Sequence, residues 1–508
     1  MTQRTPLLFR SLLIVIALSI CLRASFAQET PDSHRKYQMK AVWLTTNYGL
    51  DWPHRPATDR AGEERQKRDL IHLLDQLQEI GTNTIFLQVR SKGRVIYPSK
   101  VEPLSGEFVP TTSSYKLTYD PLEFAINECH KRGMAVHAWL AVTPIGNDKQ
   151  LRQMPAGSYP HRHRRELKRY KNYWYMDPAN ASTTTHMRKV VSEILERYPV
   201  AGIHLDYIRY PDRAKQFPDA KAYKAKGGKI SIDDWRRDNI TRLVGEIYRE
   251  IKKHRADAML SASVIGTYNN VPGLRESGWT AYNDVWQDPA AWCREGVIDF
   301  VVPMMYTKGD RFYPFVGEWL KVLNVPLVVG IAPYMVHERE GNWEVAEIKE
   351  QMDYLDRLPD VAGVALFRAE HSVSSGLGTK KPIMDRWKRS AALPINGGVR
   401  MDWMDEQSLE MQGTDAGLKV SWQGGQHPRL YALYLSIDGE VPNGTDAPFL
   451  TTTDKEVVIP WSQIKSDALI GIKVSEYDLV TQSETLPFAG GLYYNKKLPD
   501  DATDTDDI

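Results

Sequence analysis

Eight short β-rich runs alternate with longer segments of helical period, and this alternation constrains the fold more than any other feature of the chain. The predicted strands are 40–46, 83–90, 134–141, 200–206, 258–264, 298–304, 326–331 and 361–367. The predicted helices between and after them are 63–80, 121–132, 183–197, 232–254, 289–295, 314–322, 342–358 and 381–389. Regular alternation of strand and helix is typical of α/β proteins with a parallel sheet. Eight such units predict a TIM-type (β/α)8 barrel over residues 38–392, with long loops at the carboxyl ends of the strands.

The pattern changes after Pro394 to short alternating strands separated by Gly, Pro, Asn and Asp. Strands are predicted at 418–422, 430–437, 456–459 and 468–477. Residues 395–495 are therefore expected to form a small all-β sandwich. The run Lys419–Trp422 followed by Tyr431–Leu435 resembles a fibronectin type III module. The acidic residues 496–508 are expected to form a frayed tail.

The amino terminus has the pattern of a secretory signal peptide. Arg4 and Arg10 precede an apolar run over residues 11–22, and small residues stand before a cleavage site after Ala27. This pattern predicts export to the periplasm or the extracellular space. The apolar run is too short to span a bilayer, so no stable membrane insertion is expected after cleavage. Lipoprotein anchoring through Cys21 is the less favoured alternative, because Ile20 stands where a small residue is required.

Charge and cysteine content exclude some classes of protein. The 65 Lys and Arg nearly balance the 64 Asp and Glu, giving a net charge of +1, and this gives no support to a nucleic-acid-binding role. Loss of residues 1–27 would remove three Arg and no acid, which changes the net charge to −2. Only Cys129 and Cys293 would remain, so no disulfide framework is expected.

Polar residues at the ends of the predicted strands mark the candidate site. Every second residue of a barrel strand points into the lumen, and barrel enzymes bind substrates at the carboxyl ends of their strands. Within the strands, this period of two places the following residues in the lumen toward that end: Gln88, Arg90, His137, Trp139, His204 and Asp206. Arg368 and Glu370 follow the eighth strand in the same way.

Several motifs occur in order at these strand ends. They are KAVWLTTNYGLDWP at 40–53, QVR at 88–90, YPS at 97–99, YDPL at 119–122, HAW at 137–139, GIHLDYIRYP at 202–211 and DFVVPMMY at 299–306. Together, over about residues 38–390, they resemble the glycosyl hydrolase-like family ten, formerly a domain of unknown function. The resemblance implies a barrel of bacterial envelope and secreted glycosidases, some of which are implicated in cutting peptidoglycan glycan strands.

Glycoside hydrolysis normally requires two carboxyl groups, one acting as nucleophile or base and the other as acid. Asp206 is the first candidate, because a buried acid at a barrel strand end is costly without a use. The alternative for Asp206 is a structural ion pair with Arg209 or Arg90. The second carboxyl group is expected to be Glu370, with Asp288 in the loop after the fifth strand as the alternative.

Other residues near the strand ends are expected to bind substrate, with ordinary packing as the alternative. Polar side chains that would orient hydroxyl or acetamido groups are Gln88, Arg90, His137, His204, Tyr207, Arg209 and Tyr306. Trp43 and Trp139 would offer ring faces to sugars. The basic segment His161–Lys171, in the loop after the third strand, is either a solvated surface or a wall that attracts an acidic glycan.

No motif for a metal or nucleotide cofactor is present, so none is predicted. Three classes of function remain. The first is an exported glycoside hydrolase of a polysaccharide, with peptidoglycan glycan strands as one candidate substrate. The second is a non-catalytic carbohydrate-binding barrel. The third is a metal-dependent barrel hydrolase, such as a polysaccharide deacetylase, that would use His137, His204 and Asp206.

Overall fold

The computed structural model describes residues 36–274, 278–393, 409–425, 428–437, 440, 442, 447–464, 469–484 and 489–494. The predicted signal peptide at 1–27 and the predicted acidic tail at 496–508 lie outside the described residues, so both remain predictions. None of the described helices is both long and apolar enough to cross a membrane.

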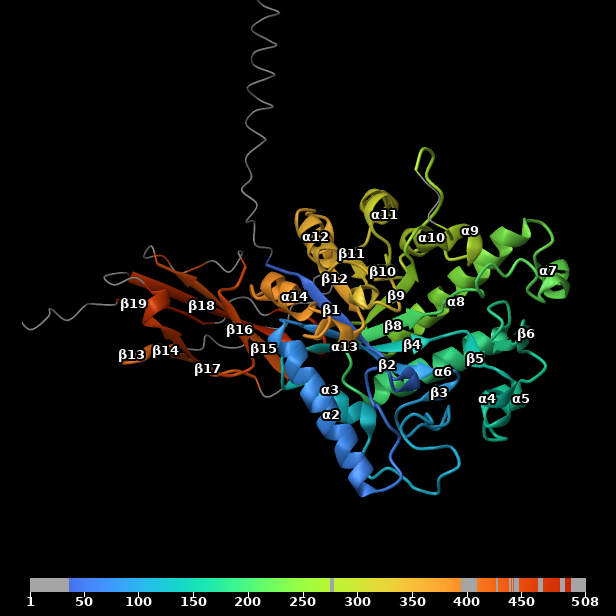
Figure 1. Cartoon of the computed structure of the whole chain (residues 1–508), viewed down its shortest axis with the longest axis horizontal. Helices are drawn as coiled ribbons and strands as arrows, with labels where there is room; N and C mark the ends of the chain where they lie inside the picture. The colour runs from blue at the N-terminus through green and yellow to red at the C-terminus, as the bar shows by residue number, and fades with distance from the viewer. Residues whose placement is uncertain are drawn as a thin grey trace, which may run out of the picture. The chain divides into compact units, whose positions relative to one another are not determined.

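Eight parallel strands form a closed barrel (Figure 1). They are β1 (Met39–Leu44), β2 (Thr84–Ser91), β4 (Ala135–Ala141), β8 (Gly202–Asp206), β9 (Met259–Ile265), β10 (Phe300–Met304), β11 (Leu327–Ile331) and β12 (Val361–Phe367). Each strand pairs with its neighbours in chain order, and β1 closes the barrel by pairing with both β12 and β2. The predicted (β/α)8 barrel is therefore confirmed, and each of its strands lies within two residues of the predicted bounds at either end.

Eight helices follow the strands. They are α2 (Arg60–Glu79), α3 (Pro121–His130), α6 (Ala181–Arg197), α8 (Ile232–His254), α10 (Pro289–Arg294), α11 (Tyr313–Val322), α12 (Val345–Asp356) and α14 (Lys380–Trp387). Their starts follow from capping residues, since the side chains of Asp59, Asp120, Asn180 and Ser231 each accept a hydrogen bond from a first-turn N–H. Their apolar faces and the outward faces of the strands share one large buried cluster.

A second buried cluster fills the lumen. It consists of Met39, Ala41, Trp43, Phe86, Trp139, Met259, Phe300, Val302, Val328 and Ala365. Gly330 leaves room for the Trp43 indole, because a Cβ at this glycine would lie 2.9 Å from the indole Cη2. The barrel is thus a packed core, and ligands can reach only its carboxyl end, which we call the mouth.

Short elements surround the mouth, and the sequence patterns did not predict them. Those after β1, β2 and β4 are η1 (Asn47–Gly49), β3 (Arg94–Val95), β5 (Pro144–Gly146), α4 (Asp148–Arg152), α5 (Tyr159–Arg162), β6 (Lys168–Tyr170) and β7 (Tyr173–Tyr175). Those after the later strands are α7 (Ala220–Lys226), α9 (Ala281–Asp284), η2 (Gly309–Arg311), η3 (Pro333–Val336) and α13 (Ala369–Ser372). Strands β5, β7 and β6 form a small antiparallel sheet within the loop that joins β4 to α6.

The carboxyl-terminal region is all-β. One antiparallel sheet contains β13 (Glu410–Thr414), β14 (Gly417–Ser421) and β17 (Glu456–Pro460), and the other contains β16 (Leu450–Thr452), β15 (Arg429–Ser436), β18 (Leu469–Asp478) and β19 (Ala489–Tyr494). Residues of both sheets, among them Val420 and Ile472, share one buried cluster. The four predicted strands are confirmed, and three more are found. The likeness to fibronectin type III stays a prediction.

Candidate active site

Asp206 is the last residue of β8 and lies at the mouth of the barrel. Its Oδ2 accepts a hydrogen bond of 3.1 Å from Nε1 of Trp139, and its Oδ1 accepts bonds from Ser263 Oγ at 2.9 Å and from the backbone N–H of Tyr207 at 2.7 Å. Burial raises the pKa of Asp206, and the positive charge of Arg209 opposes part of this rise. Three donors therefore orient both oxygens of one buried carboxylate.

Deeper in the lumen, His204 is fully buried and has both ring nitrogens engaged. Its Nε2 accepts a hydrogen bond of 3.0 Å from Nε1 of Trp43, and its Nδ1 lies 2.9 Å from Ser261 Oγ. Because Nε2 is an acceptor, the proton is on Nδ1. Phe86 stacks on the ring at 4.2 Å. Both side chains belong to the packed lumen, and their predicted substrate contacts stay predictions.

His137 is also buried in the lumen, between the rings of Phe86 and Phe300. Neither ring nitrogen has a hydrogen-bond partner among the described residues, and burial lowers the pKa of His137 to about 3. The side chain is therefore neutral and fully buried. Its predicted contact with substrate stays a prediction.

Gln88 and Arg90 have structural partners that use their polar groups. Oε1 of Gln88 accepts hydrogen bonds from Thr45 Oγ1 at 2.7 Å and from Asn47 N at 2.9 Å, so it holds the chain that leaves β1. Arg90 is fully buried and forms a two-bonded ion pair with Glu102 at 2.9 and 2.7 Å. The interactions seen for these two residues are internal, and their predicted substrate contacts stay predictions.

Aromatic side chains form one wall beside Asp206. Trp139 lies 6.5 Å from the ring of Phe367, and Tyr306 stacks on Phe367 at 5.6 Å. Tyr334 contacts both Tyr306 and Phe367 edge to face. The hydroxyl of Tyr306 has no hydrogen-bond partner among the described residues, and burial raises its pKa, with smaller contributions from Tyr334 and Asp206. Tyr306 thus keeps a free hydroxyl close to the carboxylate, while Trp139 is a positioning residue whose ring is almost fully buried.

Glu370 lies in α13, directly after β12, and its side chain is 39% exposed. Its Oε1 lies 3.2 Å from Nε2 of His54, and its Oε2 lies 3.3 Å from Nη1 of Arg368. Arg368 also pairs with the buried carboxylate of Asp51, whose Oδ1 accepts the backbone N–H of Glu370 at 3.0 Å. Burial raises the pKa of Asp51 to about 6, although Arg368 opposes the shift. Asp51 is part of the 40–53 motif but was not singled out from the sequence.

Asp288 has a structural role. It is the N-cap of α10, where Oδ1 accepts the N–H of Ala291 at 3.1 Å and the hydroxyl of Tyr268 at 2.9 Å. Both contacts lie within the β9 to β10 connection, and no contact joins Asp288 to Asp206 among the described residues. No contact joins Glu370 to Asp206 among the described residues either, so the choice between Glu370 and Asp288 stays a prediction.

Exposed tyrosines, rather than tryptophans, stand around the mouth. Tyr207 and Tyr48 follow β8 and β1, are 43% and 63% exposed, and have positive φ angles of 48° and 60°. A left-handed backbone is uncommon for residues other than glycine and is enriched at functional sites. Tyr173 and Tyr175 of β7 lie within electrostatic reach of these tyrosines. Of this group only Tyr207 was predicted, since loop positions such as 48 and 173 carry no periodic signal.

Arg209 is buried beside Tyr207. Its guanidinium lies 4.7 Å from the centre of the Tyr207 ring and 5.3 Å from that of Trp279, and it pairs with Asp212. Its charge acts on Asp206, although no hydrogen bond joins the two side chains among the described residues. The charge of Arg209 therefore limits the rise in the pKa of Asp206, and its guanidinium packs against the exposed ring of Tyr207.

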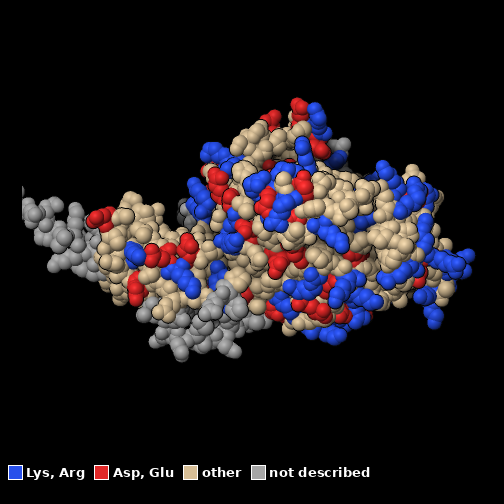
Figure 2. Space-filling model, turned by 90° about the horizontal axis from the view of Figure 1, so that it is seen from below, with Lys and Arg blue, Asp and Glu red and all other residues tan. Residues whose placement is uncertain are grey.

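The basic segment 161–171 is partly paired. Arg169 lies 3.0 Å from Asp148, Lys168 lies 3.6 Å from Asp177, and the guanidinium of Arg164 lies 3.3 Å from the centre of the Trp174 ring. Arg162 and Arg165 are exposed. In Figure 2 many blue side chains gather at the right-hand end, the end where Figure 1 places α7 and β6. Attraction of acidic glycans by this surface stays a hypothesis.

The proposed metal ligands do not converge. Both nitrogens of His204 are engaged, and His137 lies beside Gly202 of the neighbouring strand, two residues deeper than His204. Across the described residues, no group of three or more His, Cys, Asp and Glu is placed to hold a metal ion. The described structure therefore gives no support to a metal-dependent deacetylase that would use His137, His204 and Asp206 as ligands.

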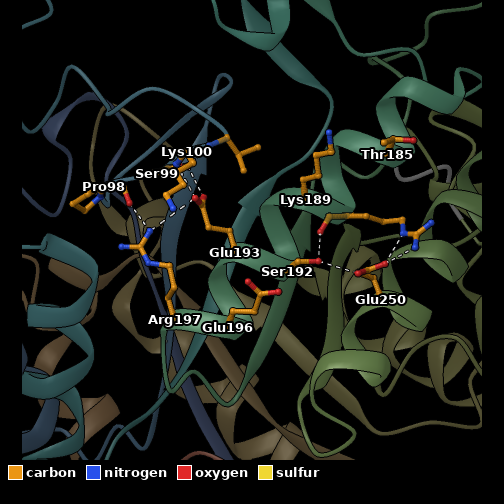
Figure 3. Close-up of a pocket in the computed structure, with 12 residues that line it drawn as sticks. Pro98, Ser99, Lys100, Thr185, Lys189, Ser192, Glu193, Glu196, Arg197 and Glu250 are labelled. Carbon is orange, nitrogen blue, oxygen red and sulfur yellow. Dashed lines mark hydrogen bonds and ion pairs between the residues drawn. The ribbon is translucent and has the colours of Figure 1, made fainter.

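A cavity of about 870 Å³ lies away from the mouth, between α6, α8 and the loop at 98–101 (Figure 3). Its charged groups largely neutralise one another. Arg188 pairs with Glu250 at 2.6 Å, while Glu193 accepts the backbone N–H of Lys100 at 2.7 Å and lies 3.9 Å from Arg197. These contacts tie the loop to the helices, which is a structural role.

A parallel barrel with a fixed, buried carboxylate at a strand end defines an enzyme-like barrel of the kind that glycosidases use. A family model, glycosyl hydrolase-like 10, matches residues 38–336. The chain belongs to this family. The match is shorter than the expected 38–390 and ends before Glu370.

Named relatives cover most of the chain. Glycosyl hydrolase DigH of Escherichia coli (strain K12) is 30% identical over 419 residues, which are 73% of this chain and 94% of that protein. Glycosyl hydrolase YngK of Bacillus subtilis (strain 168) is 27% identical over 388 residues, covering 72% and 74%. Among solved structures, the PgaB (BpsB) glycoside hydrolase domain from Bordetella bronchiseptica has a TM-score of 0.48 and 12% identity, over 70% of this chain and 99% of that chain.

Proposed function

We propose that this protein is a glycoside hydrolase in which Asp206 acts as the nucleophile or the general base. The observation that carries the proposal is the carboxylate of Asp206, held at the mouth by Trp139, Ser263 and the backbone of Tyr207. A carboxylate with a raised pKa is a stronger base, and a fixed orientation removes the entropic cost of aligning it with the reacting atom. Both properties suit attack at an anomeric carbon or activation of water.

Glu370 is the proposed general acid. It follows β12, which is separated from β8 by three strands in either direction around the barrel, so the two carboxyl groups belong to opposite sides of the mouth. Glycosidases place their two carboxyl groups on either side of the scissile bond. The guanidinium of Arg368 pairs with both Glu370 and the buried Asp51. Because Asp51 partly neutralises it, Arg368 stabilises the ionised form of Glu370 less than it would in an exclusive pair.

The proposed substrate is a polysaccharide outside the cytoplasm. Support comes from the exposed rings of Tyr48 and Tyr207, since aromatic faces pack well against the apolar faces of sugars. Further support comes from relatives that are named glycosyl hydrolases. Export rests on the signal peptide predicted at residues 1–27, and peptidoglycan glycan strands are the first candidate substrate.

The test is release of reducing sugar ends from a panel of purified glycans that includes peptide-free peptidoglycan, chitin and neutral glucans. We expect turnover on at least one glycan, and loss of that turnover in Asp206→Asn. Binding of a glycan without release of reducing ends from any of them would contradict hydrolysis and favour a carbohydrate-binding barrel.

A further inference from the structure

A cavity of about 350 Å³ opens beside the mouth, next to the ends of β1 and β2. Most of its lining residues are polar, although Ile96, Pro110 and Met154 also line it. Among the lining residues are Asn47, Lys92, Arg94, Glu107, Gln150 and Gln153. The volume is at the small end of the range for ligand sites in proteins, which suits one substituted sugar unit rather than a long segment of polymer.

Two half-buried cations face this cavity without a carboxylate partner. Nζ of Lys92 donates a hydrogen bond of 2.7 Å to Oδ1 of Asn47 and lies 3.4 Å from the centre of the Tyr48 ring. Arg94 donates to the carbonyl oxygens of Leu104 at 3.1 Å and of Gln153 at 2.9 Å. Within the described part of the chain, neither residue forms an ion pair with Asp or Glu.

A cation that is partly removed from water and lacks a counter-ion is unfavourable, and a bound anion would offset that cost. Burial lowers the pKa of Arg94, and the charge of Glu102, which is paired with Arg90 and His186, opposes part of this fall. Glu107 also lines the cavity, so two cations face one carboxylate and the local charge is positive. The cavity between α6 and α8 differs, because Arg188 and Arg197 there have acidic partners (Figure 3).

The cavity shares its wall with the proposed catalytic site. The N–H of Asn47 donates to Oε1 of Gln88, which also accepts from Thr45. The N–H of Thr45 in turn donates to Oδ2 of Asp51 at 2.9 Å, and Asp51 holds the backbone of Glu370. One short segment, residues 45–51, therefore connects the cavity to the proposed acid, and a polymer bound at the mouth would extend toward Lys92 and Arg94.

We propose that Lys92 and Arg94 form a subsite for a carboxylate substituent of the glycan, at a sugar unit away from the cleaved bond. The proposal rests on the proposed function, because it supposes a glycan at the mouth. It adds that the substrate class is an acidic glycan, which is recognised by a charge-assisted contact outside the reacting centre. Tyr48 would then contact the sugar that lies between this subsite and the mouth.

The test is titration calorimetry of the whole protein with a tetrasaccharide that alternates N-acetylglucosamine and glucuronic acid. The matched probe is the same tetrasaccharide with its carboxyl groups reduced to hydroxymethyl groups, and a third probe is the reduced form carrying one sulfate. We expect the wild-type protein to bind the carboxylated probe about tenfold more tightly than the reduced one. Lys92→Gln and Arg94→Gln should each remove most of that difference and leave the affinity for the reduced probe unchanged.

Lys189→Gln is the matched control, since it removes an exposed cation from the cavity between α6 and α8. It should leave the preference intact. Arg94→Lys, with thermal unfolding measured alongside, separates loss of the anion contact from loss of fold, because it should recover part of the preference. Equal affinity of the wild-type protein for the carboxylated and reduced probes, or equal effects of Arg94→Gln and Lys189→Gln, would overturn the subsite. Equal affinity for the sulfated and carboxylated probes would also overturn the proposal, because it would show that the site binds anions in general rather than carboxylates.

The two proposals fail separately in these measurements. Hydrolysis of a glycan without any preference for the carboxylated probe would remove the subsite and keep the hydrolase. The protein could instead prefer the carboxylated probe through Lys92 and Arg94 and yet release no reducing ends from any glycan. That result would keep the subsite and remove the hydrolase.

Discussion

The indole N–H of Trp139 donates a hydrogen bond of 3.1 Å to Oδ2 of Asp206, and the same indole lies 6.5 Å from Phe367 on the opposite side of the barrel. One side chain thus orients the proposed catalytic carboxylate and packs against the strand that precedes Glu370. This relationship connects the two sides of the mouth through a single buried ring.

Removal of the Asp206 carboxylate should abolish turnover. Asp206→Asn keeps the side-chain volume but cannot act as nucleophile or base, so we expect kcat to fall by more than about a thousandfold with little change in the melting temperature. Asp360→Asn is the control, because Asp360 is exposed in the turn that precedes β12, at the amino ends of the barrel strands. Activity of Asp206→Asn within about tenfold of wild type would exclude the assignment, since that corresponds to only about 1.4 kcal/mol of barrier.

Trp139→Phe should move the pH dependence of activity. A hydrogen bond to an ionised carboxylate lowers its pKa, so loss of the indole donor should raise the pKa of Asp206 further. The base would then be protonated at higher pH, and the acidic limb of the kcat/KM profile should shift to higher pH. Trp43→Phe is the matched control, because Trp43 donates to His204 rather than to Asp206. Identical profiles for both variants and the wild type would remove the positioning role of Trp139.

Substrates with different leaving groups can show whether Glu370 or Asp288 is the general acid. An acid catalyst matters for a poor leaving group and hardly at all for an activated aryl glycoside that departs without protonation. We expect Glu370→Gln to lose at least about a hundredfold more rate on the poor leaving group than on the aryl glycoside. Asp288→Asn keeps an oxygen that can cap α10, so it should leave the rates on both substrates close to wild type. The opposite pattern would transfer the role to Asp288.

The exposed tyrosines should affect substrate binding more than chemistry. Tyr48→Ala and Tyr207→Ala remove ring faces at the rim, so we expect KM for a polymeric substrate to rise several-fold while kcat changes little. The phenylalanine substitutions keep the ring and should behave like wild type. If the alanine and phenylalanine variants have the same KM, the rings do not bind sugar.

Glu102 should determine acid stability. Burial raises its pKa, but Arg90 and His186 outweigh this effect, so that the pKa is lowered from 4.5 to about 2. As the pH falls below about 4.5, the unfolded chain binds a proton that the folded chain does not, and stability is lost as the pH approaches about 2. Above pH 4.5 the contribution is fully present and amounts to about 3 kcal/mol.

Glu102→Gln should therefore lower the free energy of unfolding at pH 7 by about 3 to 5 kcal/mol, because it leaves Arg90 buried without its counter-ion. It should also flatten the dependence of stability on pH between about 4.5 and 2. Glu246→Gln, which breaks a surface ion pair with Arg249, should cost less than about 1 kcal/mol. Chemical denaturation across pH provides the measurement, and equal losses in the two variants would contradict a buried network.

The barrel, the short strands beyond it and the position of Asp206 at a strand end could all be predicted from the sequence. These features depend on local properties of the chain. The period of two in β8 directs His204 and Asp206 to one face whatever the rest of the chain does. The period of 3.6 and the capping residues likewise define helices such as α8 from their own residues.

Which of the polar side chains at the strand ends have partners on other elements could be seen only in the folded structure. Gln88 and His204 point inward as predicted, but each is used by a partner on another element, Thr45 and Trp43 respectively. Arg90 does not point inward, because a β-bulge after Gln88 pairs it with Leu140, whose side chain lies in the cluster outside the lumen, and there it binds Glu102. Trp43 and His204 are 161 positions apart in the chain, and no local pattern can indicate that their side chains meet. Periodicity shows where a side chain points, whereas a hydrogen bond or a buried ion pair depends on what the rest of the fold brings opposite it.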